Sequence, residues 1–208
     1  MKILAIDTAT GFLALGAFDN GKVYEVNLNL GRSHSVLLMP VIKRVLDALG
    51  WASKEIDYFA LGLGPGSFTG IRVGVSSIKG LAWSTNKPIV GISTLDILAK
   101  NVQAEGQTIV PVIDARRSLI YASAYKIRLG QLKRIKPYML LSKEELFKKI
   151  KGECFIFGDA IGAYKDYWYP QGHNIIELAL ERIKSGKISS AFNIKPIYLF
   201  PKECQIRK

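Results

Sequence analysis

Few side chains in this sequence could bind a metal or form a disulfide. The 208 residues include only two cysteines and two histidines. Cys154 and Cys204 show neither metal-type spacing nor a CxxC pair, so we expect free thiols in a reducing environment rather than a disulfide-stabilised fold. Neither His34 nor His173 has a second histidine three or four residues away. A histidine-based metal site is therefore not expected.

Long apolar runs are also absent. No stretch approaches the roughly 18–20 residues that a membrane-spanning helix needs. The first strand-like run, KILAID, carries Lys2 and Asp7, which is unlike a signal peptide. We expect no membrane association and a cytoplasmic location. Because 49% of the residues are hydrophobic, the chain can fill a real core.

The glycine-rich run GPGSFTGIRVG, Gly64 to Gly74, lacks the residues of known catalytic loops. It follows a strand-like run and opens a helix, which favours anion binding. A Walker loop would need Gly-Lys-Ser/Thr, but Gly70 is followed by Ile71 and Arg72. The dinucleotide-binding motif GxGxxG does not match, because Ser67 stands where its third glycine is required. The nucleophile-elbow motif GxSxG does not match either, because neither residue two positions from Ser67 is glycine. The run predicts a tight turn that feeds a helix.

The rest of the chain alternates between strand and helix patterns. Asn20-Gly21 lies between two apolar runs and is a strong hairpin signal. Gly50 should end a helix that Ser33 begins, although Pro40 should kink or restart it. Ser93 with Asp96, and Ser142 with Glu145, have the spacing of a capping box. The strands expected from these patterns are 3–6, 12–18, 23–30, 58–63, 88–92, 108–113, 119–127 and 154–157, and the helices are 33–49, 68–84, one from 94, one from 142 and 174–184.

This order predicts an α/β fold of mixed sheets flanked by helices. Strands followed by a helix occur twice, which suggests two lobes of related design. We expect a first lobe over residues 1–97 and a smaller, basic second lobe over residues 98–208.

Two predicted helices have faces that packing against a single sheet does not explain. Apolar residues of the Leu37–Leu49 segment cover an arc of about 200°, roughly twice what packing on one sheet requires. In the next helix Gly70, Gly74, Ser77 and Leu81 share a face, and glycines in a helix usually mark close approach of another backbone. That neighbour could be the other helix of this chain or a helix of another subunit.

The charge is strongly and unevenly basic. The formal net charge is +12, of which residues 1–104 carry +3 and residues 105–208 carry +9. A basic field favours polyanions, because each neutralised phosphate releases counterions. The alternative is that these lysines only keep the surface soluble.

Two turns resemble the nucleotide clamp of actin-like ATPases. Asp7-Thr8-Ala9-Thr10-Gly11 resembles its first hairpin. Asp114-Ala115-Arg116-Arg117 matches the second in position, but bulky side chains stand where glycine would let the backbone approach phosphate. We interpret the clamp as degraded, with Asp7, Thr8, Thr10 and Asp114 as vestigial candidates for cofactor binding.

Several segments together resemble the TsaB (YeaZ) family: Lys2–Thr10, the GRSHSVLLMP segment, GPGSFTGIRVG, Lys79–Ala82 and Pro196–Leu199. The resemblance implies an actin-like (ribonuclease H-like) two-lobed fold. It also implies a non-catalytic role in forming N6-threonylcarbamoyladenosine beside the anticodon of tRNAs that read codons beginning with A. The expected partners are a TsaD-type catalytic paralogue and a TsaE-type ATPase. ATP and a metal would belong to those partners, and this chain would bind no cofactor of its own.

The family docks its paralogue through a helical bundle, and that surface maps onto the two helices above. The residues that the resemblance places at the interface are His34, Leu37, Leu38, Val41, Ile42, Val45, Gly70, Arg72, Val73, Gly74, Ser77 and Leu81. The same surface could form a homodimer. His34 stands alone where the paralogue has paired histidines, which agrees with the absence of the enzyme's metal.

Two other functions stay open from the sequence. One is an actin-like ATPase or phosphotransferase that uses Asp7 and Asp114. The other is a direct tRNA-binding module that uses the basic residues Lys126, Arg128, Lys133 and Arg134.

Overall fold

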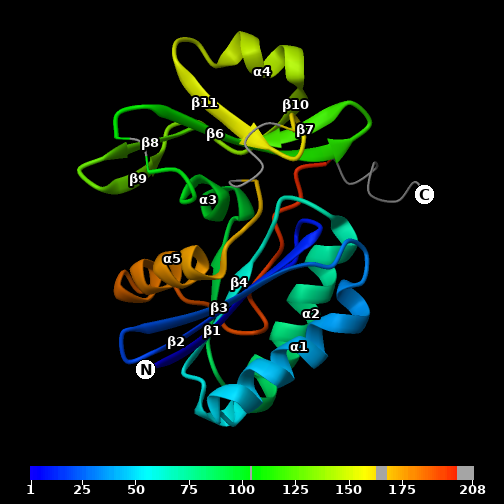
Figure 1. Ribbon diagram of the computed structural model, residues 1–208, viewed down its shortest axis with the longest axis vertical. Coiled ribbons are helices and arrows are strands. Elements are labelled where there is room, and N and C mark those ends of the chain that lie inside the picture. Colours follow the sequence, from blue (N-terminus) through cyan, green and yellow to red (C-terminus); the bar gives the residue numbers. More distant parts are fainter. Residues whose placement is uncertain (104, 163–167, 201–208) are drawn as a thin grey trace.

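The computed structural model describes residues 1–103, 105–162 and 168–200. They form two lobes stacked along the long axis of the molecule (Figure 1). The first lobe contains a five-stranded sheet with the order β3-β2-β1-β4-β5. Its strands are β1 (Lys2–Asp7), β2 (Phe12–Asp19), β3 (Lys22–Asn29), β4 (Tyr58–Gly62) and β5 (Ile89–Ile92).

The first sheet is mixed, as the sequence predicts. Strands β1, β2 and β3 are antiparallel, and β4 and β5 join β1 in parallel. The turn between β2 and β3 has positive φ at both Asn20 and Gly21, which suits an Asn-Gly hairpin. Parallel strands need crossover connections, and helices supply them here.

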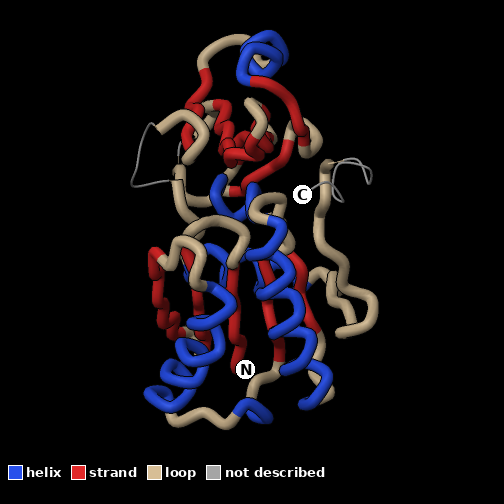
Figure 2. Tube along the Cα trace, turned by 90° about the vertical axis from the view of Figure 1, so that its right-hand side faces the viewer, coloured by secondary structure: helices blue, strands red, loops and turns tan. Residues whose placement is uncertain are grey.

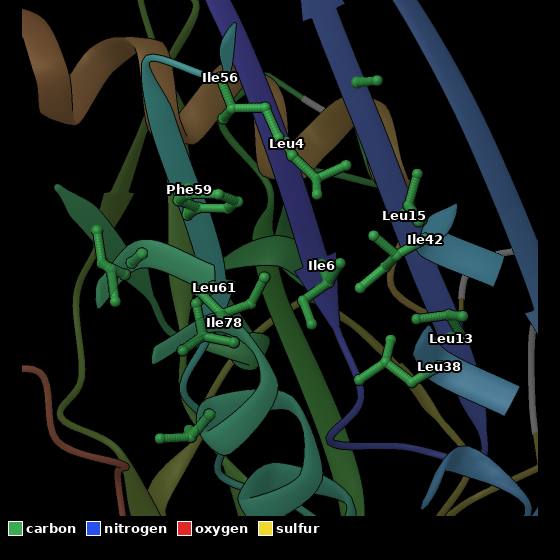
Figure 3. Packing of buried hydrophobic residues seen from close by; sticks show 14 of the residues in the cluster. Leu4, Ile6, Leu13, Leu15, Leu38, Ile42, Ile56, Phe59, Leu61 and Ile78 are labelled. Carbon is green, nitrogen blue, oxygen red and sulfur yellow. The ribbon is translucent and has the colours of Figure 1, made fainter. Parts of the chain in front are cut away.

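Helices cover both faces of the first sheet. Helices α1 (His34–Leu49) and α2 (Phe68–Thr85) contact each other, and Figure 2 shows the two side by side across the sheet. Leu38 and Ile42 of α1 and Ile78 of α2 pack on Ile6 and Leu61 (Figure 3). The opposite face packs against α5 (Gly172–Lys184). The first core is therefore a three-layer α/β/α arrangement.

Helix α1 differs from its predicted shape. The helix runs without interruption through Pro40, so the expected restart is wrong. A proline removes a single backbone donor, and the buried Leu38, Ile42 and Leu46 hold the helix against the sheet on both sides of it. Gly50 ends the helix in the left-handed conformation, at φ 66°.

The second lobe is built on a sheet with the order β10-β7-β6-β8-β9, to which β11 adds by pairing with β6. Helix α4 (Lys143–Lys149) packs against β7 and β10. The predicted capping box of Ser142 and Glu145 is confirmed at its start. The strands are β6 (Thr108–Arg116), β7 (Leu119–Ala122), β8 (Tyr125–Arg128), β9 (Gln131–Arg134), β10 (Met139–Ser142) and β11 (Cys154–Gly158).

The second lobe does not contain everything after residue 98. Helix α5 returns to the first lobe, where Ile175, Ile176 and Ala179 join the core under β1 and β5. The apolar face of α5 explains why this helix packs in the first lobe, because it covers the face of the first sheet that α1 and α2 leave open. Two short helices, η1 (Ser53–Glu55) and α3 (Thr94–Ala99), complete the described elements.

Asp96 of α3 links the lobes instead of completing a capping box. Its carboxylate accepts hydrogen bonds from Tyr125 and Tyr138 of the second lobe, at 2.8 and 2.9 Å. It also forms an ion pair with Arg182 of α5 at 3.1 Å. Ser93 caps alone, through the N–H of Leu95. The polar network therefore joins α3 and α5 to the second lobe.

No helix in the described ranges is long and apolar enough to cross a bilayer.

Candidate docking face and interlobe cavity

The glycine face of α2 is turned inward. Gly70 and Gly74 are buried, and a Cβ at either position would come closer than 3.0 Å to an oxygen of Thr8. The Thr8 hydroxyl donates a hydrogen bond to the Gly70 carbonyl at 2.7 Å. The segment that approaches these glycines is therefore the turn just after β1 of the same chain, through the Thr8 carbonyl oxygen at Gly70 and the Thr8 hydroxyl at Gly74. Their predicted place at a partner interface is wrong.

Three of the α1 residues assigned to the interface are also inside the molecule. His34, Leu38 and Ile42 are 5%, 1% and 1% exposed. Leu38 and Ile42 fill the core over β1 and β2, so they cannot contact a partner directly. The Nε2 atom of His34 is buried and has no hydrogen-bond partner in the described part of the chain.

The outer side of α1 is unusually apolar. Val36, Leu37 and Met39 are 70%, 38% and 45% exposed within two turns of one helix. Val41 and Val45 are half-buried and pack against the first core. Leu37 shares one side of α1 with Val41 and Val45 at four-residue spacing, so this side is the candidate contact surface, whereas Val36 and Met39 lie elsewhere round the helix.

Helix α2 contributes the neighbouring strip. Val73, Ser77 and Leu81 are half-buried and follow one another at four-residue spacing. Arg72 is exposed, and its guanidinium lies 3.8 Å from the ring centre of Phe68. We define the docking face by the exposed or half-buried members of the predicted set, which are Leu37, Val41, Val45, Arg72, Val73, Ser77 and Leu81.

A cavity of about 580 Å³ opens between the lobes, at the ends of β1 and β6. The N-terminal turn of α2 forms one wall, through Ser67 and Phe68. Both signs of charge and several aromatic rings line it. The remaining lining residues include Thr10, Arg32, Asp114, Arg116, Tyr121, Asp159, Tyr198 and Phe200.

Two of the four clamp candidates do not line this cavity. Asp7 is fully buried, and its two carboxylate oxygens accept hydrogen bonds from Thr94 at 2.5 Å and from the N–H of Ala9 at 2.7 Å. Burial raises the pKa of Asp7 above its ordinary value, against the lowering effect of those hydrogen bonds. Thr8 is held by Gly70. The side chains of Asp7 and Thr8 therefore form hydrogen bonds inside the protein and do not face the cavity.

The other two candidates reach the cavity wall but are engaged within the chain. The Thr10 hydroxyl accepts a hydrogen bond from the N–H of Phe12 at 3.1 Å. Asp114 forms an ion pair with Arg116 at 3.1 Å. Arg116 and the two residues after it all have positive φ, between 53° and 66°, a conformation that bulky side chains seldom adopt. The strained tip of the β6–β7 turn thus carries the Arg116 side chain at the position where a nucleotide clamp needs a backbone that phosphate can approach.

Asp159 is the carboxylate that the sequence prediction missed. It lines the cavity and accepts a hydrogen bond from the N–H of Asp114 at 2.8 Å. Burial raises the pKa of Asp159, and the negative charge of Asp114 raises it further. Its only sequence signal is a place just after a buried strand, which many structural carboxylates share.

The structure describes one of the two cysteines. Cys154 is a free thiol at the start of β11, and burial raises its pKa. Cys204 lies outside the described residues. Among the described residues, no group of three or more histidine, cysteine, aspartate or glutamate side chains could hold a metal ion.

Comparison with known proteins places this geometry in a family. Residues 29–189 match the family model described as "TsaD: tRNA N6-adenosine threonylcarbamoyltransferase". The "tRNA threonylcarbamoyladenosine biosynthesis protein TsaB" of Bacillus subtilis is 36% identical over 79% of this chain and 74% of its own length. The chain belongs to the TsaB (YeaZ) family. The Escherichia coli TsaB protein is 28% identical over 96% of this chain and 94% of its own length.

Solved structures of TsaB relatives share the whole architecture. The structure "YeaZ from Pseudomonas aeruginosa" superimposes with a TM-score of 0.85 at 26% identity, covering 95% of this chain and 99% of that one. A second structure from that organism, an uncharacterised protein similar to the peptidase YEAZ, gives a TM-score of 0.86 at 26% identity, covering 96% and 99%. The actin-like, two-lobed α/β fold expected of a TsaB protein is thereby confirmed.

Proposed function

We propose that this chain is the non-catalytic partner subunit of a TsaD-type enzyme that forms N6-threonylcarbamoyladenosine on tRNAs reading A-starting codons. TsaB relatives carry the name of threonylcarbamoyladenosine biosynthesis, and the family model that spans most of the chain is that of the transferase. The proposal places the protein in the cytoplasm, where its substrate tRNA would be modified.

One observation carries the proposal: the apolar side of α1 that carries Leu37, Val41 and Val45, in a helix that contacts α2 with its half-buried strip. Within that strip Ser77 is small enough to admit a neighbouring helix. Two neighbouring helices with apolar sides suit docking of a second helix pair. A TsaD-type paralogue of the same fold would offer such a pair, and so would a second copy of this chain.

The state of the clamp supports the absence of chemistry in this subunit. Asp7 would have to leave two hydrogen bonds and a fully buried position to touch a ligand in the cavity. The Asp114 carboxylate already forms an ion pair with Arg116. The ATPase or phosphotransferase alternative is therefore disfavoured. We propose that ATP and metal belong to the TsaD-type and TsaE-type partners, and that this chain needs no cofactor for docking.

Charge and bulk on the docking face should abolish the complex. In the variant Leu37→Glu with Ser77→Arg, a carboxylate and a long cation would be buried against the partner's helices. We expect the affinity for the TsaD-type partner to fall at least about 30-fold, as for a central interface residue. Isothermal titration calorimetry of the purified proteins measures this directly.

Met39→Glu is the matched control. Met39 is on the same helix and is 45% exposed, but it is two residues from Leu37 and so lies about 200° round the helix axis. Its substitution should change the affinity less than about threefold. Unchanged partner binding by the Leu37→Glu, Ser77→Arg variant would show that the docking face is misplaced.

A further inference from the structure

The β8–β9 hairpin has two faces of opposite character. Directly opposed residues in an antiparallel pair share a face, and the register pairs Lys126 with Lys133 and Arg128 with Gln131. These four therefore form one face. The other face carries Ile127 and Leu132, which pack on the core of the second lobe.

Arg134 belongs to the inner face, although the sequence groups it with the basic patch. It is paired in register with the buried Tyr125, and its guanidinium lies 4.1 Å from the ring centre of Tyr138. The predicted patch of Lys126, Arg128, Lys133 and Arg134 is therefore split by the pleat. We call the remaining three, Lys126, Arg128 and Lys133, the hairpin face.

The hairpin face is an unfavourable arrangement for the isolated chain. Lys126 and Lys133 oppose each other, where like charges destabilise a strand pair. Within the described ranges, no carboxylate forms an ion pair with any of the three cations. Glu105 is close, but its carboxylate accepts from the N–H of Leu129 at the hairpin tip. A ligand with several negative charges would relieve this repulsion.

The basic surface continues from the hairpin towards α4. Lys126 pairs with Thr108 of β6, and Thr108 pairs with Cys154 of β11. Two strand spacings, about 10 Å, therefore separate Lys126 from Cys154. Lys151 precedes Cys154 by three residues and is exposed, within about 10 Å of it. Lys148 and Lys149 at the end of α4 are exposed too.

The composition of this surface fits nucleic acid better than protein. The hairpin face and its neighbour Gln131 are polar, and only Leu129 at the hairpin tip, 96% exposed, is a large apolar side chain there. Closely spaced cations without carboxylate partners favour a polyanion over a protein surface. Successive cations on β8 are about 6.6 Å apart, in a row that can follow a phosphate backbone. Phe147, 60% exposed beside Lys148, offers a ring on which an unpaired base can stack.

We infer that the hairpin face, with Lys148, Lys149 and Lys151, binds the phosphate backbone of RNA. This inference rests on the proposed function, since the RNA would be the tRNA that the complex modifies. The surface is in the second lobe, on the outer side of its sheet, and it leaves α1 and α2 free (Figure 1). One chain can therefore hold its protein partner and the substrate at the same time.

The test compares two variants of equal charge. One replaces the hairpin face with Lys126→Gln, Arg128→Gln and Lys133→Gln. The control replaces Lys22, Lys54 and Lys195, three exposed lysines of the first lobe, with glutamine. Binding of an unmodified tRNA transcript is measured over a series of salt concentrations, with the chain alone and with its TsaD-type partner.

The hairpin variant should bind tRNA at least about tenfold more weakly, and its log–log salt slope should fall by about 2 to 3, whereas the control should stay within twofold. Equal losses in both variants, no loss in either, or no tRNA binding by the unaltered chain with or without the partner would overturn the inference. Partner binding is measured in parallel. If the hairpin variant loses the partner instead of tRNA, the face docks protein, and the RNA inference is wrong.

A second variant separates binding from folding. Lys133→Glu would place opposite charges across the strand pair, so the midpoint of thermal unfolding should rise by about 1–4 °C. The same substitution should weaken tRNA binding at least about tenfold. Damage to the fold cannot produce this combination. A stabilised variant that keeps its full affinity for tRNA would contradict the inference.

Discussion

Gly70→Ala should destabilise the protein by about 2 kcal/mol or more, although alanine is the better helix former. The new methyl group would meet the carbonyl oxygen of Thr8 at less than 3.0 Å, and that oxygen belongs to the backbone of a buried turn. Forcing extra atoms into a packed site costs about 1–3 kcal/mol and sometimes more, which exceeds the gain of about 1 kcal/mol in helix propensity. Urea unfolding followed by circular dichroism measures the difference.

Gly80→Ala provides the control in the same helix. Gly80 is exposed, and a Cβ there would meet nothing within 4 Å. Only the propensity gain remains, so this substitution should stabilise the protein by about 0.5–1 kcal/mol. Opposite signs for two glycine-to-alanine changes in one helix follow from packing of α2 on β1. Equal effects would show that Thr8 does not confine Gly70.

Asp96→Ala should have the second large effect, a loss of about 2–4 kcal/mol in the free energy of unfolding. The side chain is 14% exposed and accepts from Tyr125, Tyr138 and Arg182, so its removal leaves three donors without their acceptor. Asp47→Ala is the matched control. Asp47 pairs only with Lys43 on the surface of α1, and its loss should cost less than about 0.5 kcal/mol.

The same substitution should change the alkaline limb of the stability curve. Burial, and then the negative charge of Asp96, raises the pKa of Tyr138 to about 12. A raised pKa in the folded state favours the protonated fold, so stability is lost as pH rises from about 10, where the unfolded tyrosine ionises, to about 12. Without Asp96 the pKa of Tyr138 should fall. Ultraviolet titration of phenolate would detect that shift, and an unchanged Tyr138 titration would contradict the role of Asp96.

Sequence patterns predicted the layers of the fold because local physics determines them. Asn20-Gly21 fixes a hairpin, Gly50 ends a helix, and Ser142 with Glu145 begins one. Arg116 and Arg117 in the second clamp-like turn are also visible in the sequence, and the interpretation that the clamp is degraded stays a prediction. Each of these features depends on a few neighbouring residues.

The sequence could not decide which side of a helix faces inward when both sides are apolar. Helical periodicity places Gly70 and Gly74 on one face, but only the position of Thr8 shows that the turn after β1 fills it. For the same reason the sequence places Leu38 and Ile42 at the partner interface, although both side chains are buried in the core. The sequence places Asp96 in a cap, because the groups that donate hydrogen bonds to it lie in segments far along the chain. Contacts distant in sequence leave no periodic signal.

Two surfaces of this chain could serve the complex. We propose that the docking face on α1 and α2 does so and that the interlobe cavity has no chemical role. Each surface can be altered separately. Leu37→Glu with Ser77→Arg changes the docking face, and Asp114→Ala with Arg116→Ala removes the ion pair in the cavity wall.

The most direct test is formation of threonylcarbamoyladenosine on tRNA by the reconstituted complex containing each variant. With limiting amounts of this chain, the docking-face variant should lower product formation at least about 30-fold, in proportion to lost partner binding. The cavity variant should stay within about twofold of the unaltered chain. The opposite pattern, full activity without the docking face and none without the cavity pair, would contradict the account and assign this subunit a chemical role.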